Sequence, residues 1–233
     1  MNKISVIIVA GGSGTRMGAG IPKQFLPLTD GATILETTLR RFLTALPGCR
    51  AVVVLPAAET VRWQKLCRER GLCGTHTVCT GGATRFESVR NGLTALDACD
   101  YIAVHDGVRP LVSETLIHTC LRTAERYGTA VPALRPVDSF RTVGPDGTSR
   151  PTDRDALRAV QTPQIFRADL LRRAYETEYR PEFTDDASVA EAAGIRVTLC
   201  EGERKNIKIT SPDDLLVARA LAGGTCAAKR EGL

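Results

Sequence analysis

Short apolar runs rich in β-branched residues recur along the chain, and the stretches between them carry apolar residues at helical spacing. The runs predict β-strands at 3–10, 50–56, 100–106, 128–134 and 195–200. The stretches between them predict helices near 33–46, 58–70, 85–97, 113–126, 167–178, 185–193 and 212–222. Strands and helices that alternate in this way favour a mostly parallel, twisted sheet covered on both faces. We therefore expect an α/β protein with three layers, α/β/α.

One segment, about 136–158, interrupts this alternation. The sequence "GPDG" at 144–147 is a turn signal between two short extended pieces. A hairpin there has little apolar surface to bury against its own sheet, so we expect it to project, either as a flap over a site or as an arm around a second subunit. Because α/β folds of this length often form one unit, we expect residues 1–233 to be a single domain with this arm.

The charge of the chain favours a small anionic ligand. The formal net charge is +5, but the basic residues are spread along the sequence and form no run. Binding to nucleic acid is therefore not supported. No apolar stretch is long enough to span a bilayer, so we also expect no membrane partner.

The eight cysteines do not suggest a disulfide framework or a zinc site. They form no CxxC pair and no cluster with histidine at zinc spacing, and several lie in apolar runs. No signal peptide precedes the first strand. We expect free thiols and a reducing, cytoplasmic location.

A glycine-rich turn follows the first strand, in "VIIVAGGSGTRMGAGIPKQFLPL" at 6–28. Gly11, Gly12 and Gly14 would let backbone N–H groups approach phosphate oxygens closely. The turn is not a P-loop, because it lacks the G-K-[ST] sequence. It also fails as a dinucleotide fingerprint, because Met17 replaces the third glycine and the second strand ends without an acidic residue. Hydride transfer is therefore disfavoured.

Two cations, Arg16 and Lys23, accompany this turn. Beside a triphosphate they would neutralise the charge that develops on the α-phosphorus and on departing pyrophosphate. The alternative is a glycine-rich turn with two solvated charges, and the turn by itself does not decide between them.

Two later stretches carry further candidate residues. In "GGATRFESVRNGL" (81–93), Gly81 and Gly82 could contact a base edge through their backbone, and Ser88 could meet a ribose or phosphate. An ordinary capped helix is the alternative. In "AVHDGVRPLV" (103–112), Asp106 and Arg109 come just after a buried strand, where open α/β sheets place ligand-binding groups. A structural salt bridge between these two side chains is the alternative.

Three later stretches carry weaker signals. Thr162 in "AVQTPQIF" and Thr184 in "FTDDAS" offer hydroxyls that suit a polyol or a phosphate. Lys208 in "RKNIKIT" alternates with two isoleucines, a pattern that by itself indicates a solvent-facing strand position. None of these stretches supplies a general base next to a nucleophile.

The stretch "AGGSGTRMGAGIPKQFLPL" resembles the signature A-[AG]-G-x-G-x-R-M, followed closely by P-K-Q, of the cytidylyltransferases that act on 2-C-methyl-D-erythritol 4-phosphate. The resemblance extends from residue 3 to about 222 and includes six motifs in order. It implies a Rossmann-like nucleotidyltransferase fold, CTP as a substrate, and Mg²⁺ held mainly by the CTP phosphates without a direct protein ligand. It also implies a homodimer in which the arm crosses to the second subunit.

The resemblance implies specific roles for individual residues. As catalytic cations it implies Arg16, Lys23 and Lys208. For CTP binding it implies Ala10, Gly11, Gly12, Gly14, Gly81, Gly82, Arg85, Ser88 and Asp106. For binding of the polyol phosphate it implies Asp106, Arg109, Ser139, Arg154, Thr162 and Thr184, with Arg154 presented to the neighbouring subunit's substrate. Two positions depart from the family pattern: Ser139 stands where threonine is more usual, and Ala83 where an acidic residue is common.

The reaction that the resemblance implies is attack of the polyol phosphate on the α-phosphate of CTP, giving 4-diphosphocytidyl-2-C-methyl-D-erythritol and pyrophosphate. The attacking phosphate oxygen is already ionised near neutral pH, so no general base is required. Alternative acceptors and functions stay open at this point: D-ribitol 5-phosphate as the acceptor, a sugar 1-phosphate with another nucleotide, or a non-catalytic nucleotide-binding subunit.

Overall fold

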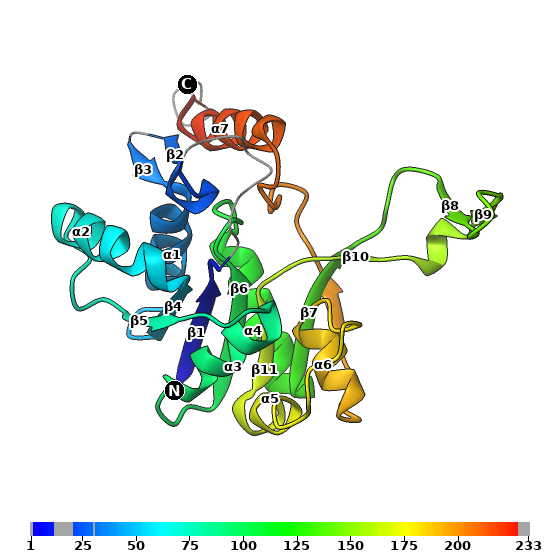
Figure 1. Ribbon diagram of the computed structural model, residues 1–233, viewed down its shortest axis with the longest axis horizontal. Coiled ribbons are helices and arrows are strands. Elements are labelled where there is room, and N and C mark those ends of the chain that lie inside the picture. The colour runs from blue at the N-terminus through cyan, green and yellow to red at the C-terminus, as the bar shows by residue number, and fades with distance from the viewer. Residues whose placement is uncertain (1, 12–20, 30, 228–233) are drawn as a thin grey trace, which may run out of the picture.

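The computed structural model describes residues 2–11, 21–29 and 31–227, with side chains described as far as residue 223 (Figure 1). Its central sheet has eight strands in the described part of the chain, in the order β10-β7-β11-β6-β1-β4-β5, and β12 also pairs with β7. The strands are β1 (Ile4–Val9), β4 (Arg50–Leu55), β5 (Thr77–Thr80), β6 (Tyr101–Asp106), β7 (Thr129–Leu134), β10 (Ala159–Val160), β11 (Gln164–Arg167) and β12 (Leu199–Glu201).

The sheet is mostly parallel, as predicted. Strands β6, β1, β4 and β5 are parallel neighbours and β12 is parallel to β7, whereas β10 and β11 run antiparallel to the strands they pair with. Strands β5, β10 and β11 were not predicted. They are short, and β5 contains only two apolar residues, Val78 and Cys79.

The predicted strand at 195–200 is shorter than expected and lies at Leu199–Glu201. The residues before it bond to β7 through a side chain. The Thr129 hydroxyl donates to the Arg196 carbonyl at 3.1 Å and accepts the Thr198 N–H at 2.9 Å. These bonds add to one backbone bond, in which the Val131 N–H donates to the Thr198 carbonyl at 2.9 Å.

The helices cover both faces of the sheet. The hydrophobic core on one face contains side chains of α1 (Ile34–Ala45), α2 (Thr60–Arg70) and α4 (Glu114–Tyr127). The core on the other face contains side chains of α3 (Arg85–Thr94), α5 (Ala168–Ala174) and α6 (Asp186–Ala192). Successive residues of β1 alternate between the two cores, as a strand buried on both sides requires. The three-layer prediction is confirmed.

Helix α7 (Pro212–Ala227) lies over the small β2 (Pro27–Thr29) and β3 (Ala32–Thr33) ribbon (Figure 1). A third core joins Leu28, Val108, Ile209 and Leu215 at this end of the molecule. The helix continues through Gly223 and Gly224, beyond its predicted end at 222, since each glycine weakens a helix by only about 1 kcal/mol. No helix in the described ranges has both the length and the apolar character needed to cross a membrane.

The connections create a crevice at the carboxyl edge of the sheet. From β1 the chain runs through α1 and α2 on one face to β4 and β5, and α3 on the other face then brings it back to β6 on the opposite side of β1. The strand order reverses between β1 and β6, and such a reversal separates the loops that follow the two strands. The site is therefore expected beyond Val9 and Asp106.

The segment predicted as a hairpin forms β8 (Phe140–Val143) and β9 (Ser149–Thr152), which pair antiparallel to each other. The turn between them has Gly147 at φ 79°, and the Asp146 carboxylate accepts the Thr148 N–H at 3.0 Å. Figure 1 shows this arm projecting away from the central sheet. Every residue of β8 is exposed, so the hairpin prediction is confirmed.

Candidate active site

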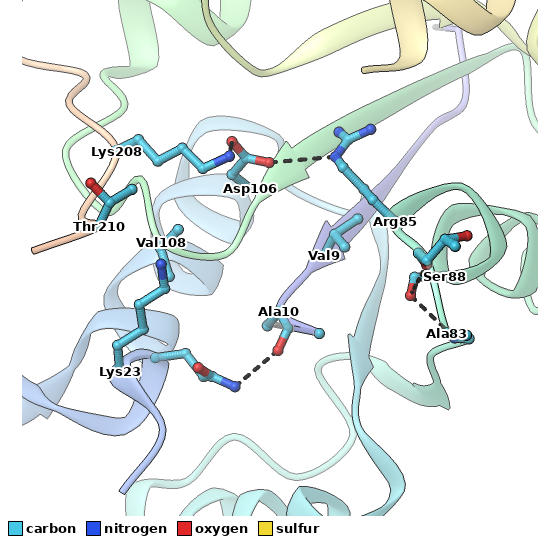
Figure 2. Close-up of a pocket in the computed structure, with 14 residues that line it drawn as sticks. Val9, Ala10, Lys23, Ala83, Arg85, Ser88, Asp106, Val108, Lys208 and Thr210 are labelled. Atoms are coloured by element: carbon cyan, nitrogen blue, oxygen red, sulfur yellow. Dashed lines mark hydrogen bonds and ion pairs between the residues drawn. The ribbon is translucent and has the colours of Figure 1, made fainter. Parts of the chain in front are cut away.

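Two cavities lie side by side at the carboxyl edge of β1 and β6. The larger encloses about 550 Å³ and the smaller about 330 Å³. Arg85, Asp106 and Lys208 line both, so these three side chains form a shared wall. Figure 2 shows the larger cavity, with Lys208 and Arg85 on either side of Asp106 and Lys23 across the opening.

Asp106 is the electrostatic centre of this wall. Its Oδ2 lies 3.1 Å from Lys208 Nζ and 3.2 Å from Arg109 Nε, and its Oδ1 lies 3.8 Å from Arg85 Nε. Burial alone would raise the pKa of this carboxyl, but Arg85, Lys208 and Arg109 together hold it well below its ordinary value. Asp106 is thus ionised and fixes three cations at the end of β6.

Arg85 has a second and closer partner in Asp186. Its Nη2 donates to Asp186 Oδ2 at 2.7 Å, and the Tyr175 hydroxyl donates to Asp186 Oδ1 at 2.6 Å. Asp186 is fully buried. Burial opposes the charge on Arg85, yet Asp186 and Asp106 raise the pKa of this guanidinium above its usual value. Asp186 therefore holds Arg85 at the cavity wall.

The segment that carries Lys208 is bound to the rest of the site through Asn206. The Asn206 carbonyl accepts from Arg109 Nη1 at 2.8 Å, and its side-chain amide donates to the Thr162 carbonyl at 2.8 Å. Gln161 Nε2 donates to the Glu203 carbonyl at 2.9 Å. These bonds fix the position of Lys208 relative to Asp106, although Lys208 comes from a distant part of the sequence.

His105 stabilises the loop that holds Asp106 and Arg109. Burial lowers the pKa of His105 to about 4, so the imidazole is neutral at pH 7. Its Nε2 lies 3.1 Å from the Arg109 carbonyl, which can only accept, so Nε2 carries the proton. Nδ1 then accepts from the Thr162 hydroxyl at 3.0 Å, and Thr162 Oγ1 accepts the Asp106 N–H at 3.1 Å. A substrate contact by Thr162 would use the remaining lone pair of this oxygen.

The turn before α3 is ordered by its own side chains. Thr84 and Glu87 form a capping box, in which Glu87 Oε2 accepts the N–H groups of Ala83 at 2.7 Å and Thr84 at 3.1 Å. The Gly82 N–H donates to Ser88 Oγ at 3.2 Å, and the Gly81 N–H donates to the Leu55 carbonyl at 2.8 Å. Both predicted glycines thus have their N–H groups engaged inside the protein.

Lys23 and the end of β1 line the larger cavity together. Buried Gln24 donates from Nε2 to the Ala10 carbonyl at 2.9 Å, which fixes the Lys23 backbone beside the end of the strand. Gly12 and Gly14, which were predicted to bind CTP, and Arg16, which was predicted as a catalytic cation, lie outside the described residues.

Most of the predicted residues that the structure describes gather at these cavities. The larger is lined by Ala10, Gly11, Lys23, Gly82, Arg85, Ser88, Asp106 and Lys208, and the smaller by Arg85, Asp106, Arg109, Thr162, Thr184 and Lys208. Gly81 lies behind Ser88, where an added Cβ would come within 2.8 Å of Ser88 Oγ. Ser139 and Arg154 line neither cavity, because both belong to the exposed arm region.

The sequence reasoning did not single out several residues of the site: Gln24, Arg158, Gln161, Tyr175 and Asp186. Gln24 lies within the "PKQ" motif, of which only the lysine was predicted to have a functional role. Asp186 is the second acid of "FTDDAS", and an acid pair at a helix start ordinarily indicates an N-cap followed by a solvated acid in the first turn. Here Asp185 caps α6, while Asp186 points inward to Arg85.

Comparison with known proteins gives one consistent result. The family model for 2-C-methyl-D-erythritol 4-phosphate cytidylyltransferase matches residues 4–223. A curated protein of that name from Bacteroides fragilis is 46% identical over 93% of this chain and 98% of its own length. The crystal structure of the enzyme of that name from Thermus thermophilus is 35% identical, with a TM-score of 0.74 over 94% of this chain and 98% of that one. The 4-diphosphocytidyl-2C-methyl-D-erythritol synthase from Anaerococcus prevotii is 28% identical, with a TM-score of 0.79 over 95% of this chain and 99% of that one.

Proposed function

The chain belongs to the 2-C-methyl-D-erythritol 4-phosphate cytidylyltransferase family, and from that premise we propose how its two cavities divide the reaction. The activity is transfer of a cytidylyl group from CTP to 2-C-methyl-D-erythritol 4-phosphate, a step of isoprenoid precursor biosynthesis. We assign CTP to the larger cavity and the polyol phosphate to the smaller. The observation that carries this assignment is the wall of Arg85, Asp106 and Lys208 that the two cavities share.

The shared wall lies where the reacting groups have to meet. An oxygen of the acceptor phosphate forms a bond to the α-phosphorus of CTP, and the bond from that phosphorus to the bridging oxygen of the β-phosphate breaks. Pyrophosphate leaves with the electron pair. The attacking oxygen is already ionised, so no proton has to be removed from it. His105 is consistent with this, because both of its ring nitrogens are engaged in holding the loop.

Lys208 and Lys23 are suited to stabilise the transition state. Lys208 Nζ lies at the boundary between the cavities, beside Asp106, and is 44% exposed in its side chain, so it can reach an incoming phosphate. Lys23 lines the larger cavity only, which suits contact with the triphosphate. Arg16 has the same role in this proposal on the basis of its place in the motif. Preorganised cations of this kind stabilise charge that develops on the α-phosphorus and on pyrophosphate.

The turn at Gly81 and Gly82 suits recognition of cytosine. Because both N–H groups are engaged inside the protein, the backbone contacts available to a base are carbonyl oxygens. A carbonyl accepts a hydrogen bond from the 4-amino group of cytosine, whereas uracil presents a carbonyl oxygen there. The capping box keeps this turn in place before the nucleotide binds.

Mg²⁺ is expected to accompany CTP. Among the described residues that line the larger cavity, Asp106 is the one carboxylate, and both of its oxygens already face cations. This donor set fits an ion held mainly by triphosphate oxygens and water. When bound there, Mg²⁺ neutralises charge on the triphosphate.

The arm is the proposed dimer contact. It exposes Val137, Phe140 and Val143 to between 43% and 66%, although apolar side chains of this size are ordinarily buried. Arg154 lines neither cavity of its own subunit, and its Nη1 donates to the Val137 carbonyl at 2.9 Å. In the proposed homodimer, Arg154 and Ser139 reach the acceptor of the partner subunit.

A cytoplasmic location is also proposed. The support for it is that the seven cysteines whose side chains the structure describes are all free thiols. Such thiols persist in a reducing compartment.

The experiment that tests the activity follows pyrophosphate release with Mg²⁺. CTP is offered with 2-C-methyl-D-erythritol 4-phosphate or with D-ribitol 5-phosphate, and ATP, GTP and UTP serve as nucleotide controls. Turnover confined to CTP and methylerythritol phosphate is the expected result. Turnover with ribitol phosphate instead would change the acceptor but keep the chemistry. Absence of turnover with either acceptor would contradict the proposal.

A further inference from the structure

The smaller cavity is lined by four cationic side chains: Arg85, Arg109, Arg158 and Lys208. Each of three has a carboxylate partner within the protein. Arg85 pairs with Asp186, and Arg109 and Lys208 pair with Asp106. Arg158 is different, because within the described ranges it has no carboxylate within 4.0 Å. Of the four cations that line this cavity, Arg158 is thus the one without a carboxylate partner among the described residues.

The hydrogen bonds of Arg158 leave most of its donors available. Its Nη1 donates to the Asp155 carbonyl at 2.8 Å and to the Leu157 carbonyl at 2.6 Å. In the described part of the chain, no hydrogen bond leaves from Nε or Nη2. These two nitrogens form one edge of the planar guanidinium, and two parallel N–H groups of this kind match two oxygens of a phosphate. The bonds through Nη1 hold the side chain at the cavity, so this edge is already positioned.

The carboxylate that also lines this cavity does not compete for Arg158. Asp185 Oδ1 accepts the Ser188 N–H at 2.9 Å, and Asp185 Oδ2 accepts from Gln164 Nε2 at 2.8 Å. Asp185 therefore completes the start of α6, and its oxygens are directed to that helix and to Gln164. Among the residues that the structure describes, the cavity therefore offers an anion one guanidinium without a carboxylate partner, beside three cations that each have one.

From these observations we propose that Arg158 binds the phosphate group of the acceptor from within its own subunit. The inference rests on the proposed assignment of the acceptor to the smaller cavity. It gives Arg158 a role separate from that of Arg154, which lies outside both cavities and reaches a substrate only in a partner subunit. Arg158 is the last residue of the arm segment, so in this proposal the same few residues supply one phosphate contact to each subunit.

The test is steady-state kinetics of Arg158→Ala, Arg158→Lys and wild type, with each substrate varied in turn. Because hydrogen bonds to charged groups contribute substantially to binding, Arg158→Ala is expected to raise the KM for 2-C-methyl-D-erythritol 4-phosphate about 10- to 100-fold. The KM for CTP is expected to stay within about twofold. Arg158→Lys keeps the charge but loses the planar pair of donors, so it recovers part of the acceptor affinity.

Arg122→Ala is the matched control, because it removes one positive charge from the exposed face of α4 and lines neither cavity. It is expected to change neither KM. An acceptor KM that stays within about twofold in Arg158→Ala overturns the proposal, as does an equal rise in both KM values, which indicates a structural role. Absence of wild-type turnover in the same assay is a separate result, because it overturns the proposed function and the inference with it.

Discussion

The pair of Arg85 and Asp186 provides the sharpest test of how this site is held together. Asp186→Asn keeps the size of the side chain and an oxygen that can accept from the Tyr175 hydroxyl. It removes the charge that lies 2.7 Å from Arg85 Nη2. The remaining carboxylate partner of Arg85 is then Asp106, whose Oδ1 lies 3.8 Å from Arg85 Nε. Asp106 already forms ion pairs with Lys208 and Arg109.

The expected loss of stability follows from burial. Removing one partner of a buried ion pair costs about 3–5 kcal/mol, because the other charge is left uncompensated. Arg85 is 26% exposed in its side chain and keeps a second partner, so we expect about 2–3 kcal/mol. For a chain of this size, that loss lowers Tm by about 5–10 °C.

The measurement is urea and thermal unfolding of Asp186→Asn, Arg85→Met and the double variant. The double variant removes both charges of the pair, so neither is left buried without its partner. It is therefore expected to be more stable than the sum of the two single effects predicts, with a coupling energy of about 2 kcal/mol. Asp169→Asn is the control. Its partner Arg167 is closer, at 2.6 Å, but both side chains are more than half exposed, and such pairs contribute little. Additive single effects, or equal losses in Asp186→Asn and Asp169→Asn, would refute the reasoning.

Three further predictions concern the loop, the cation and the arm. His105 is expected to contribute about 3 kcal/mol to the fall in unfolding free energy between pH 6.5 and pH 4, because the unfolded chain gains a proton at His105 that the folded chain excludes. Urea titrations of His105→Gln should show a shallower decline over that range, and an unchanged slope would contradict the assignment. Lys23→Ala is expected to lower kcat by about 100- to 1000-fold in the pyrophosphate assay, and full kcat would remove Lys23 from the mechanism. Val143→Asp places a charge on a side chain that is 66% exposed on the arm, and sedimentation should show dissociation into monomers. A wild-type protein that already sediments as a monomer at micromolar concentration would contradict the dimer.

The fold was largely predictable because its main elements are long and strongly patterned. β1, β4 and β6 are mostly apolar, and α4 begins at a serine cap and ends at Gly128 in the left-handed conformation. β11 was missed because its four residues owe their strand geometry to pairing with β6 and β7 on both sides. Such pairing depends on residues far along the chain and leaves little trace in the local pattern.

The candidate site, like the fold, contains a part that was predictable from the sequence and a part that was not. The motif residues that follow strands, such as Asp106 and Lys23, were predictable, because the carboxyl ends of parallel strands meet at one edge of the sheet. The partners that hold them were not. Arg85 and Asp186 are 101 positions apart, and only the packing of α3 and α6 into the same core brings them together. Arg158 lies in a polar stretch whose sequence does not distinguish a cavity-lining arginine from a solvated one.

The wall shared by the two cavities has a consequence for inhibition. The product, 4-diphosphocytidyl-2-C-methyl-D-erythritol, joins the nucleotide to the polyol, so under the proposed assignment of the cavities we expect it to occupy both at once and to exclude either substrate. A stable mimic of this product pays the entropic cost of association once, and its second half then binds at a high effective concentration. Such a compound is expected to compete with CTP and with the acceptor alike, and to bind more tightly than either.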